Sequence, residues 1–267
     1  MTASDRPILR SALLTAGTGS PVLLLHGSAS TSAMWLPVID ALKTRFRLLA
    51  PDLIGYGRTD PWPAGHDYTL DDEVKLLAPL LAGTSPPAHV VGHSYGGVVA
   101  LQLARSHRRL VRSLTLIEPV AFHLLRDADE PQACAEAEKL GQTYSAHIAA
   151  GETEGALRWF VDYWGGAGAW DAMEEAGRAQ MRRIAPKMVH DFHAAFADPG
   201  PDPWRDLPAP VRLLAGDKSP LTVRRIAAVL AQRLPSATLQ VVAGANHLLP
   251  ATHHWALSAF LLETLQA

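Results

Sequence analysis

Short apolar runs recur along the chain, and each ends at a glycine, a proline or a polar residue. The clearest runs are residues 22–25, 47–50, 90–91, 114–117, 211–215 and 239–242. Helix-like patterns separate them, and one helix is expected to begin at Thr69, with Asp71 and Asp72 in its first turn. Buried strands separated by helices predict an α/β fold, with a mostly parallel central sheet and helices on both faces.

This alternation stops between about residues 120 and 207. The segment is helical in pattern, rich in Ala and Glu, and contains no convincing strand. A Pro-rich stretch, residues 198–203, then leads back to the sheet. We expect residues 120–207 to form an inserted helical cap over the edge where the strands end, and residues 1–119 and 208–267 to form the core. Ordinary crossover helices would need an unusually long connection.

Composition and charge narrow the class of protein. A formal net charge of -2, with no strongly basic segment, argues against nucleic acid as a partner. No apolar run reaches the length of a membrane span, so no stable membrane insertion is expected. Residues 1–7 lack the apolar core of a signal peptide, and Cys134 is the only cysteine. These features favour a cytoplasmic protein and do not indicate an oligomeric state.

The stretch with the most chemical information is residues 90–97, which places Ser94 between glycines. An apolar run precedes Ser94, and a second run, residues 98–101, is typical of a helix. A serine on such a tight strand-to-helix turn has its hydroxyl lifted out of the sheet, and the glycines permit close backbone contacts. Ser94 is therefore the candidate nucleophile. Because a hydroxyl is a weak nucleophile, it needs a base within hydrogen-bond reach.

Twelve histidines could supply that base. His247 follows the last apolar run, and loops after parallel strands converge on one edge of the sheet. We therefore expect His247 to reach Ser94 as its base; the alternative is a polar loop histidine. His26 and His93 are expected to make local structural hydrogen bonds.

Neither a metal nor an organic cofactor is expected. His190 and His193 are three residues apart on a predicted helix, but no cysteine or acidic cluster completes a metal site beside them. The turn at residues 17–19 lacks the third glycine and the following helix that a dinucleotide site needs.

Four stretches together resemble the α/β-hydrolase superfamily over nearly the whole chain. They are His26-Gly27-Ser28, Asp52-Leu53-Ile54-Gly55-Tyr56-Gly57, Gly92-His93-Ser94-Tyr95-Gly96-Gly97 and the late His247. In that family, backbone N–H groups after the nucleophile and in the His-Gly turn form an oxyanion hole, which implies the N–H groups of Tyr95 and Ser28 here. The loop at Asp52 resembles a structural element of the family.

The resemblance also implies an acid behind His247 and leaves two positions for it. The family often places the acid about three residues beyond a glycine that ends the strand before the last. That position holds Ser219, and Asp217 is only one residue past the glycine. The other family position, after the strand that follows the nucleophile's helix, holds Glu118, as in certain lipases and dehalogenases. We expect Glu118 to be the acid, with Asp217 as the alternative.

Together these residues predict a serine hydrolase that cleaves a carboxylic ester, or a similar acyl compound, through an acyl-enzyme on Ser94. Its partner would be a small, apolar ester. Carbon–carbon bond hydrolases, hydroxynitrile lyases and cofactor-free oxidative enzymes share much of the pattern, and a non-catalytic binding protein is a further alternative. Trp159, Tyr163 and Trp164 suit the wall of an apolar pocket, or they pack the cap onto the core.

Overall fold

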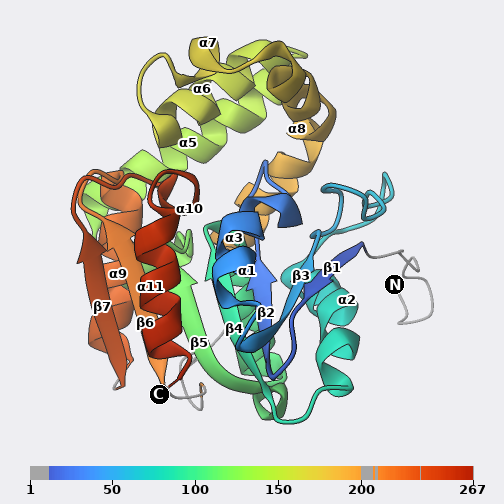
Figure 1. The fold of residues 1–267 in the computed structure, drawn as a ribbon. Coiled ribbons are helices and arrows are strands. Elements are labelled where there is room, and N and C mark those ends of the chain that lie inside the picture. The colour runs from blue at the N-terminus through green and yellow to red at the C-terminus, as the bar shows by residue number, and fades with distance from the viewer. Residues whose placement is uncertain (1–11, 200–206, 208–209, 235, 267) are drawn as a thin grey trace.

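The computed structural model describes residues 12–199, 207, 210–234 and 236–266. Seven strands form one sheet in this part of the chain (Figure 1). They are β1 (Leu13–Ala16), β2 (Ser20–Leu25), β3 (Phe46–Pro51), β4 (Ala88–His93), β5 (Val111–Ile117), β6 (Val211–Gly216) and β7 (Ala237–Val242). Their order is β1-β3-β2-β4-β5-β6-β7, with β1 antiparallel to β3 and every other pair parallel. The predicted mostly parallel sheet is confirmed.

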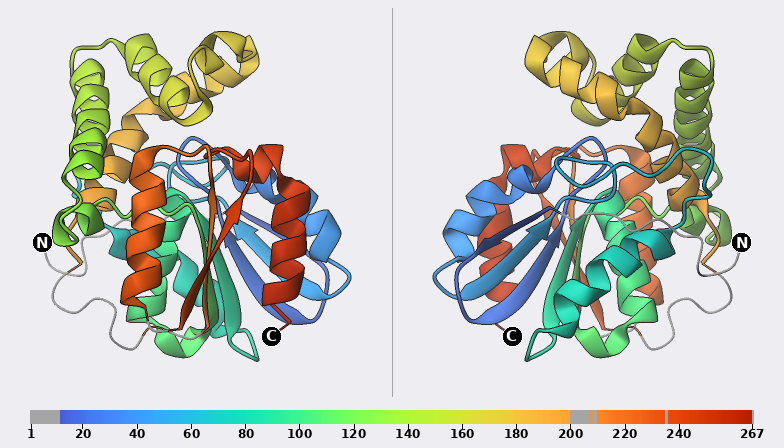
Figure 2. Two further views of the ribbon diagram at one scale, coloured as in Figure 1. Left: turned by 90° about the vertical axis from the view of Figure 1, so that its left-hand side faces the viewer. Right: turned by 90° about the vertical axis from the view of Figure 1, so that its right-hand side faces the viewer.

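Helices cover both faces of the sheet, because the strands present apolar side chains to both sides. The covering helices are α1 (Leu36–Leu42), α2 (Leu70–Ala82), α3 (Tyr95–Ser106), α9 (Leu221–Arg233) and α11 (His254–Thr264). Val22 and Leu24 belong to the core that α1 and α11 complete. Leu23 and Leu25 belong to the core that α2, α3 and α9 complete. The left view of Figure 2 shows α9 and α11 on opposite sides of the sheet.

The segment between β5 and β6 is helical, and its described residues contain no strand. It includes α4 (His123–Asp127), α5 (Pro131–Ala149), α6 (Thr153–Gly165), α7 (Ala169–Ala172) and α8 (Glu175–Phe196). The last four, here called the cap helices, lie beyond the ends of the strands (Figure 1). The predicted helical insertion between the strands is therefore present, and its role as a cap stays a prediction. Its exact boundaries stay a prediction, because residues 200–206 and 208–209 of the Pro-rich return lie outside the described residues.

The edge strand β1 is missing from the sequence-based prediction. It is at most half-buried and offers only the pair Leu13 and Leu14, so it lacks the apolar run that marks the inner strands. The start of α2 follows the prediction. Thr69 is its N-cap, and the Thr69 N–H donates to Asp72 Oδ2 (3.0 Å) in a capping box. Residues 1–7, where no signal peptide is expected, lie outside the described residues.

Candidate active site

Ser94 lies on the sharp turn between β4 and α3. Its backbone angles, φ 54° and ψ −122°, are rarely adopted by residues other than glycine. The flanking glycines make this turn possible. A Cβ on Gly92 would lie 2.3 Å from the Gly96 carbonyl oxygen, and a Cβ on Gly96 would lie 2.4 Å from the carbonyl oxygen of His26. The turn therefore brings β4, α3 and the end of β2 closer together than side chains would allow.

His247 reaches Ser94 from the loop after β7. Its Nε2 lies 2.9 Å from Ser94 Oγ, and its Nδ1 lies 2.7 Å from Glu118 Oε2. Because an ionised carboxylate only accepts hydrogen bonds, Nδ1 carries the proton and Nε2 accepts from the Ser94 hydroxyl. The exposed fractions are 7% for Ser94, 4% for His247 and 0% for Glu118. The structure thus brings three of the predicted site residues into one buried row.

Glu118 follows directly after β5, at a φ of 47°. Its Oε1 accepts hydrogen bonds from the Gly216 N–H (2.6 Å) and from the Ser219 hydroxyl. Ser219 stands where the family often has its acid, and here it donates to the carboxylate that the neighbouring strand supplies. Both oxygens of Glu118 are therefore held, one by β6 and its loop and the other by His247.

The charge of Glu118 follows from these contacts. Burial by itself raises the pKa of the carboxyl, but hydrogen bonds from His247, Ser219 and Gly216 outweigh it and hold the pKa below its ordinary value. Glu118 is therefore ionised at neutral pH. The alternative acid, Asp217, is exposed, and its Oδ1 accepts from the Gly244 N–H (2.8 Å). It does not make the contact with His247 that Glu118 makes.

The two backbone N–H groups expected to form an oxyanion hole flank Ser94. Tyr95 is the first residue of α3, so its N–H has no partner within that helix. A Cβ on Gly27 would lie 2.9 Å from Ser94 Cβ, so the turn that carries Ser28 passes directly beside the candidate nucleophile. Ser28 and Tyr95 line the same small cavity as Ser94.

Two further histidines support this geometry through neutral rings. His93 Nε2 donates to the His247 carbonyl oxygen (3.0 Å), and burial lowers the pKa of His93 to about 3. His26 Nδ1 donates to the Gly27 carbonyl oxygen (2.8 Å), and its Nε2 accepts from the Leu53 N–H (2.9 Å). Burial lowers the pKa of His26 to about 4. Both rings hold the backbone of site loops, which is the structural role expected for them.

Ser94 lies at the boundary of two cavities. The larger has a volume of about 260 Å³ and is lined by His247 and mainly by apolar side chains. The smaller has a volume of about 20 Å³ and is lined by Ser28, Tyr95 and Asp191 besides apolar residues. Trp164 lines both cavities and stacks on the His247 imidazole, with ring centroids 4.0 Å apart. An apolar enclosure therefore covers the hydroxyl of Ser94.

Of the three aromatic residues expected at the pocket wall, Trp164 is the one that lines these two cavities. The Trp159 ring faces the Lys139 ammonium, 5.7 Å from its centroid. Tyr163 packs edge-on against Trp164, and its hydroxyl donates to Glu136 Oε1 (2.6 Å). Phe160, one helical turn before Trp164, lines both cavities.

A buried charged cluster joins α8 to the core beside the smaller cavity. Lys187 Nζ donates to Asp191 Oδ1 and lies 3.9 Å from Glu73 Oε1. Asp191 Oδ2 accepts from the Ser28 hydroxyl (2.5 Å) and from the Tyr56 hydroxyl. Asp191 thus ties a cap helix to the turn that carries one candidate oxyanion donor.

Reasoning from the sequence missed this cluster. Lys187 and Asp191 are four residues apart on a predicted helix, which was the available signal, but such pairs usually face solvent. Burial raises the pKa of Glu73, and the charge of Lys187 and the hydrogen bond from Tyr68 partly offset that rise. The ammonium also lies 4.2 Å from the Tyr68 ring centroid, so aromatic rings share in holding the cation.

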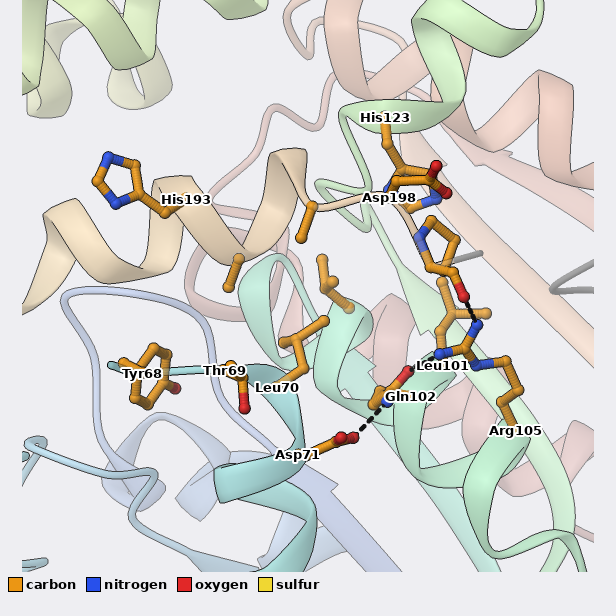
Figure 3. Close-up of a pocket in the computed structure, with 14 residues that line it drawn as sticks. Tyr68, Thr69, Leu70, Asp71, Leu101, Gln102, Arg105, His123, His193 and Asp198 are labelled. Carbon is orange, nitrogen blue, oxygen red and sulfur yellow. Dashed lines mark hydrogen bonds between the residues drawn. The ribbon is translucent and has the colours of Figure 1, made fainter. Parts of the chain in front are cut away.

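A separate cavity of about 340 Å³ lies between α2, α3 and the end of α8 (Figure 3). Polar side chains in its lining pair with one another: Gln102 donates to Asp71 (2.5 Å), and Arg105 donates to Gln102 (2.8 Å). Ser94 and His247 do not line it. This cavity is therefore distinct from the candidate active site.

Among the described residues, no helix is both long and apolar enough to cross a membrane. In the same part of the chain, His, Cys, Asp and Glu side chains form no group of three or more that could hold a metal ion. A cytoplasmic location and the lack of a nucleic-acid partner stay predictions.

Comparison with known proteins identifies the family. Residues 22–257 match the family model described as "Alpha/beta hydrolase family". The chain belongs to this family. The match spans both parts of the sheet and the inserted helices between them, in agreement with the resemblance inferred from the motifs.

The chain shares only part of its length with similar curated proteins. A "Probable lysophospholipase BODYGUARD 3" of Arabidopsis thaliana is 36% identical over 117 residues, which are 42% of this chain and 23% of that protein. A "Cis-3-alkyl-4-alkyloxetan-2-one decarboxylase" of Shewanella oneidensis is 32% identical over 111 residues, which are 40% of this chain and 35% of that protein. The alpha/beta hydrolase MGS-M2, from a Medee basin deep-sea metagenome library, has a TM-score of 0.80 at 18% identity, with 96% of this chain and 94% of that chain covered. This last likeness is one of fold.

Proposed function

We propose that the protein is a serine hydrolase that cleaves a carboxylic ester, or a similar acyl compound, through an acyl-enzyme on Ser94. The observation that carries this proposal is the row from Glu118 Oε2 through the His247 imidazole to Ser94 Oγ, with distances of 2.7 and 2.9 Å. Acid, base and nucleophile in such a row activate serine in hydrolases of unrelated folds. In this proposal Ser94, His247 and Glu118 form a catalytic triad, and Asp217 lies outside it.

Acylation begins when Ser94 Oγ bonds to the ester carbonyl carbon and its proton passes to His247 Nε2. The ionised Glu118, hydrogen-bonded to His247 Nδ1, stabilises the imidazolium that forms. Negative charge moves onto the carbonyl oxygen, where the N–H groups of Ser28 and Tyr95 are the proposed donors. Each such donor lowers the barrier by roughly 3 kcal/mol.

The intermediate then collapses and the carbon–oxygen bond to the alcohol breaks. His247 Nε2 returns its proton to the departing oxygen, so a neutral alcohol leaves and the acyl group stays on Ser94. A water molecule attacks the acyl carbon in turn, giving its proton to His247. The carboxylic acid departs when Ser94 Oγ regains that proton, and the cycle closes without a net gain or loss of protons.

The surroundings of Ser94 favour an apolar ester as substrate. The larger cavity is lined mainly by apolar side chains, and no Asp, Glu, Lys or Arg is among its lining residues. A serine nucleophile rather than an aspartate disfavours epoxide hydrolysis and dehalogenation. The name of the Arabidopsis relative, a probable lysophospholipase, agrees with hydrolysis, whereas that of the decarboxylase from Shewanella indicates a different activity among similar proteins.

A substrate panel tests the proposal. Purified protein would be assayed on p-nitrophenyl esters, a vinylogous diketone and a cyanohydrin, with Ser94→Ala as the matched variant. We expect ester hydrolysis by the wild type and a loss of at least about a thousandfold in Ser94→Ala. Cleavage of the diketone or the cyanohydrin without ester hydrolysis would replace the proposal with one of the alternatives. Absence of turnover together with no labelling by a fluorophosphonate would favour a binding protein.

We also propose the division into a core of residues 1–119 and 208–267 and a cap of residues 120–207. The position of the cap helices beyond the strand ends supports it (Figure 1). In this arrangement the core supplies Ser94, His247 and Glu118, and the cap supplies Trp164, Phe160 and Asp191 to the cavities.

A further inference from the structure

Ser94 separates two cavities of very different size, and His247 belongs to the lining of one of them. The cavity of about 260 Å³ is lined by His93, Ser94 and His247. The cavity of about 20 Å³ is lined by Ser94 and Tyr95 but not by His247, and Ser28 lines both cavities. Such a volume leaves room for only a small group. The two parts of an ester bound at Ser94 therefore meet very different amounts of space.

The position of His247 decides which part of the ester fills which cavity. His247 Nε2 has to return a proton to the alcohol oxygen, so the alcohol must lie on the side that His247 lines. The carbonyl oxygen points at the proposed donors, the Ser28 and Tyr95 N–H groups. The acyl chain then takes the third direction, into the part of the small cavity that Phe122 and Phe192 line. We infer that the enzyme hydrolyses esters of short acyl groups, acetyl or propionyl, with bulky apolar alcohols. This inference rests on the proposed ester hydrolysis.

The larger cavity suits an alcohol without charge. Its apolar walls come from both the core and the cap and include Met34, Phe160, Trp164, Met173, Met181 and Leu248. Methionine side chains are flexible and polarisable, so the three in this lining let the cavity adapt to alcohols of different shape. With no Asp, Glu, Lys or Arg in the lining, neither a cationic nor an anionic alcohol finds a partner there.

The smaller cavity is closed by rings and by one carboxylate. Phe122 and Phe192 stack with centroids 6.5 Å apart, and Phe160 packs against Phe192 at 6.1 Å. Asp191 lines the same cavity, with both of its oxygens already accepting hydrogen bonds. An ionised carboxylate only accepts hydrogen bonds, so an acyl group with a free carboxylate finds no partner at Asp191. The acyl group that fits is therefore short, apolar and uncharged.

Phe192 forms the partition that keeps this site short. Its side chain lines the cavity of about 20 Å³ and also a cavity of about 360 Å³ between α5 and α8. Phe196, one helical turn later, lines the cavity of about 360 Å³ but not the small one. Removing the Phe192 ring should join the two spaces. The Phe196 ring packs on Phe122, with centroids 4.9 Å apart, so replacement of Phe196 by leucine, which keeps an apolar contact there, should leave the acyl site unchanged.

A chain-length series at constant alcohol tests the acyl side. The wild type would be assayed on 1-naphthyl acetate, propionate, butyrate and hexanoate. We expect kcat/KM for hexanoate to be at least about tenfold below that for acetate, because extra methylenes do not fit a filled site without strain. A kcat/KM for hexanoate equal to or above that for acetate would overturn the inference.

The partition variants sharpen the test. In Phe192→Ala the acetate preference over hexanoate should fall by about tenfold or more, and in the milder Phe192→Leu it should fall by less. Phe196→Leu is the matched control for Phe192→Leu and should keep the wild-type preference. An unchanged preference in both Phe192 variants, while they still hydrolyse acetate, would contradict the assignment of the small cavity to the acyl group.

A second series at constant acyl group tests the alcohol side. Ethyl acetate and 2-phenylethyl acetate have primary alcohols of similar leaving ability, and we expect the latter to have at least about tenfold higher kcat/KM, because its ring enters the apolar cavity. Equal values would count against the inference. Failure of the proposed function has a different signature: no ester is cleaved and a fluorophosphonate does not label Ser94. Ser94-dependent hydrolysis that favours long acyl chains would overturn this inference but leave the proposed ester hydrolysis standing.

Discussion

Replacing Glu118 by glutamine keeps the size of the side chain but turns one of its oxygens into a hydrogen-bond donor. Both oxygens of the carboxylate already accept: Oε2 from His247, and Oε1 from the Gly216 N–H and the Ser219 hydroxyl. An amide offers one accepting oxygen. If that oxygen faces His247, the amide NH₂ group meets the Gly216 N–H. If it faces Gly216, the amide donates to His247 Nδ1 and moves the imidazole proton to Nε2, where the base must accept.

The structure indicates which orientation dominates and how large the effect is. The Ser219 hydroxyl can rotate to accept from the amide, but the backbone N–H of Gly216 cannot, and an unsatisfied buried donor costs about 1–3 kcal/mol. The unproductive tautomer is therefore favoured about 5- to 150-fold. The enzyme molecules that keep the productive tautomer still lack the negative charge that stabilises the imidazolium. The analogous exchange in a protease triad lowers kcat about ten-thousandfold, so we expect a fall of about 10³- to 10⁴-fold here.

The assay is steady-state hydrolysis of 1-naphthyl acetate, with circular dichroism and thermal unfolding to verify the fold. Asp217→Asn is the matched control, since it makes the same chemical change at the exposed alternative acid, and it should stay within about threefold of the wild type. A kcat for folded Glu118→Gln within tenfold of the wild type would refute the reasoning. So would a crippling effect of Asp217→Asn.

Two further predictions concern stability. Burial lowers the pKa of His93 from 6.5 to about 3. As the pH falls from 6.5 towards 3, the imidazole therefore takes up a proton in the unfolded chain but not in the folded protein, and the free energy of unfolding decreases. Between pH 7 and pH 5, urea titrations should show the wild type losing about 2 kcal/mol more than His93→Asn; equal losses would contradict a buried neutral ring. Lys187→Met should cost about 3–5 kcal/mol, because Asp191 and Glu73 stay buried without their cation. Arg182→Met, at exposed ion pairs, should cost far less, and equal costs for the two variants would argue against the cluster.

The sheet and the positions of Ser94 and His247 could be predicted because they depend on local patterns. The inner strands are buried on both faces and therefore appear as apolar runs in the sequence. Ser94 sits on a turn that its flanking glycines mark, and His247 follows a strand whose end meets the same edge of the sheet. The choice between Glu118 and Asp217 was harder, since each follows a strand at that edge. Only the structure shows which carboxylate contacts His247.

The cap could be predicted as a segment but not in its contacts. Trp159 and Trp164 are five residues apart on α6, so they face different directions, and only the tertiary arrangement places Trp164 rather than Trp159 over His247. The cluster at Lys187 and Asp191 could not be predicted for the same reason. Helical spacing does not reveal that this pair is buried against Tyr56 and Ser28.

The most direct test of the central claim is rapid-quench mass spectrometry of the protein mixed with excess 1-naphthyl acetate. The account predicts a transient species heavier by one acetyl group, with the group mapped to the peptide that contains Ser94. The same species should be absent from Ser94→Ala and should form far more slowly in His247→Ala. An acetyl group on another residue that forms and decays at the rate of turnover, or wild-type turnover by Ser94→Ala, would contradict a mechanism that proceeds through Ser94.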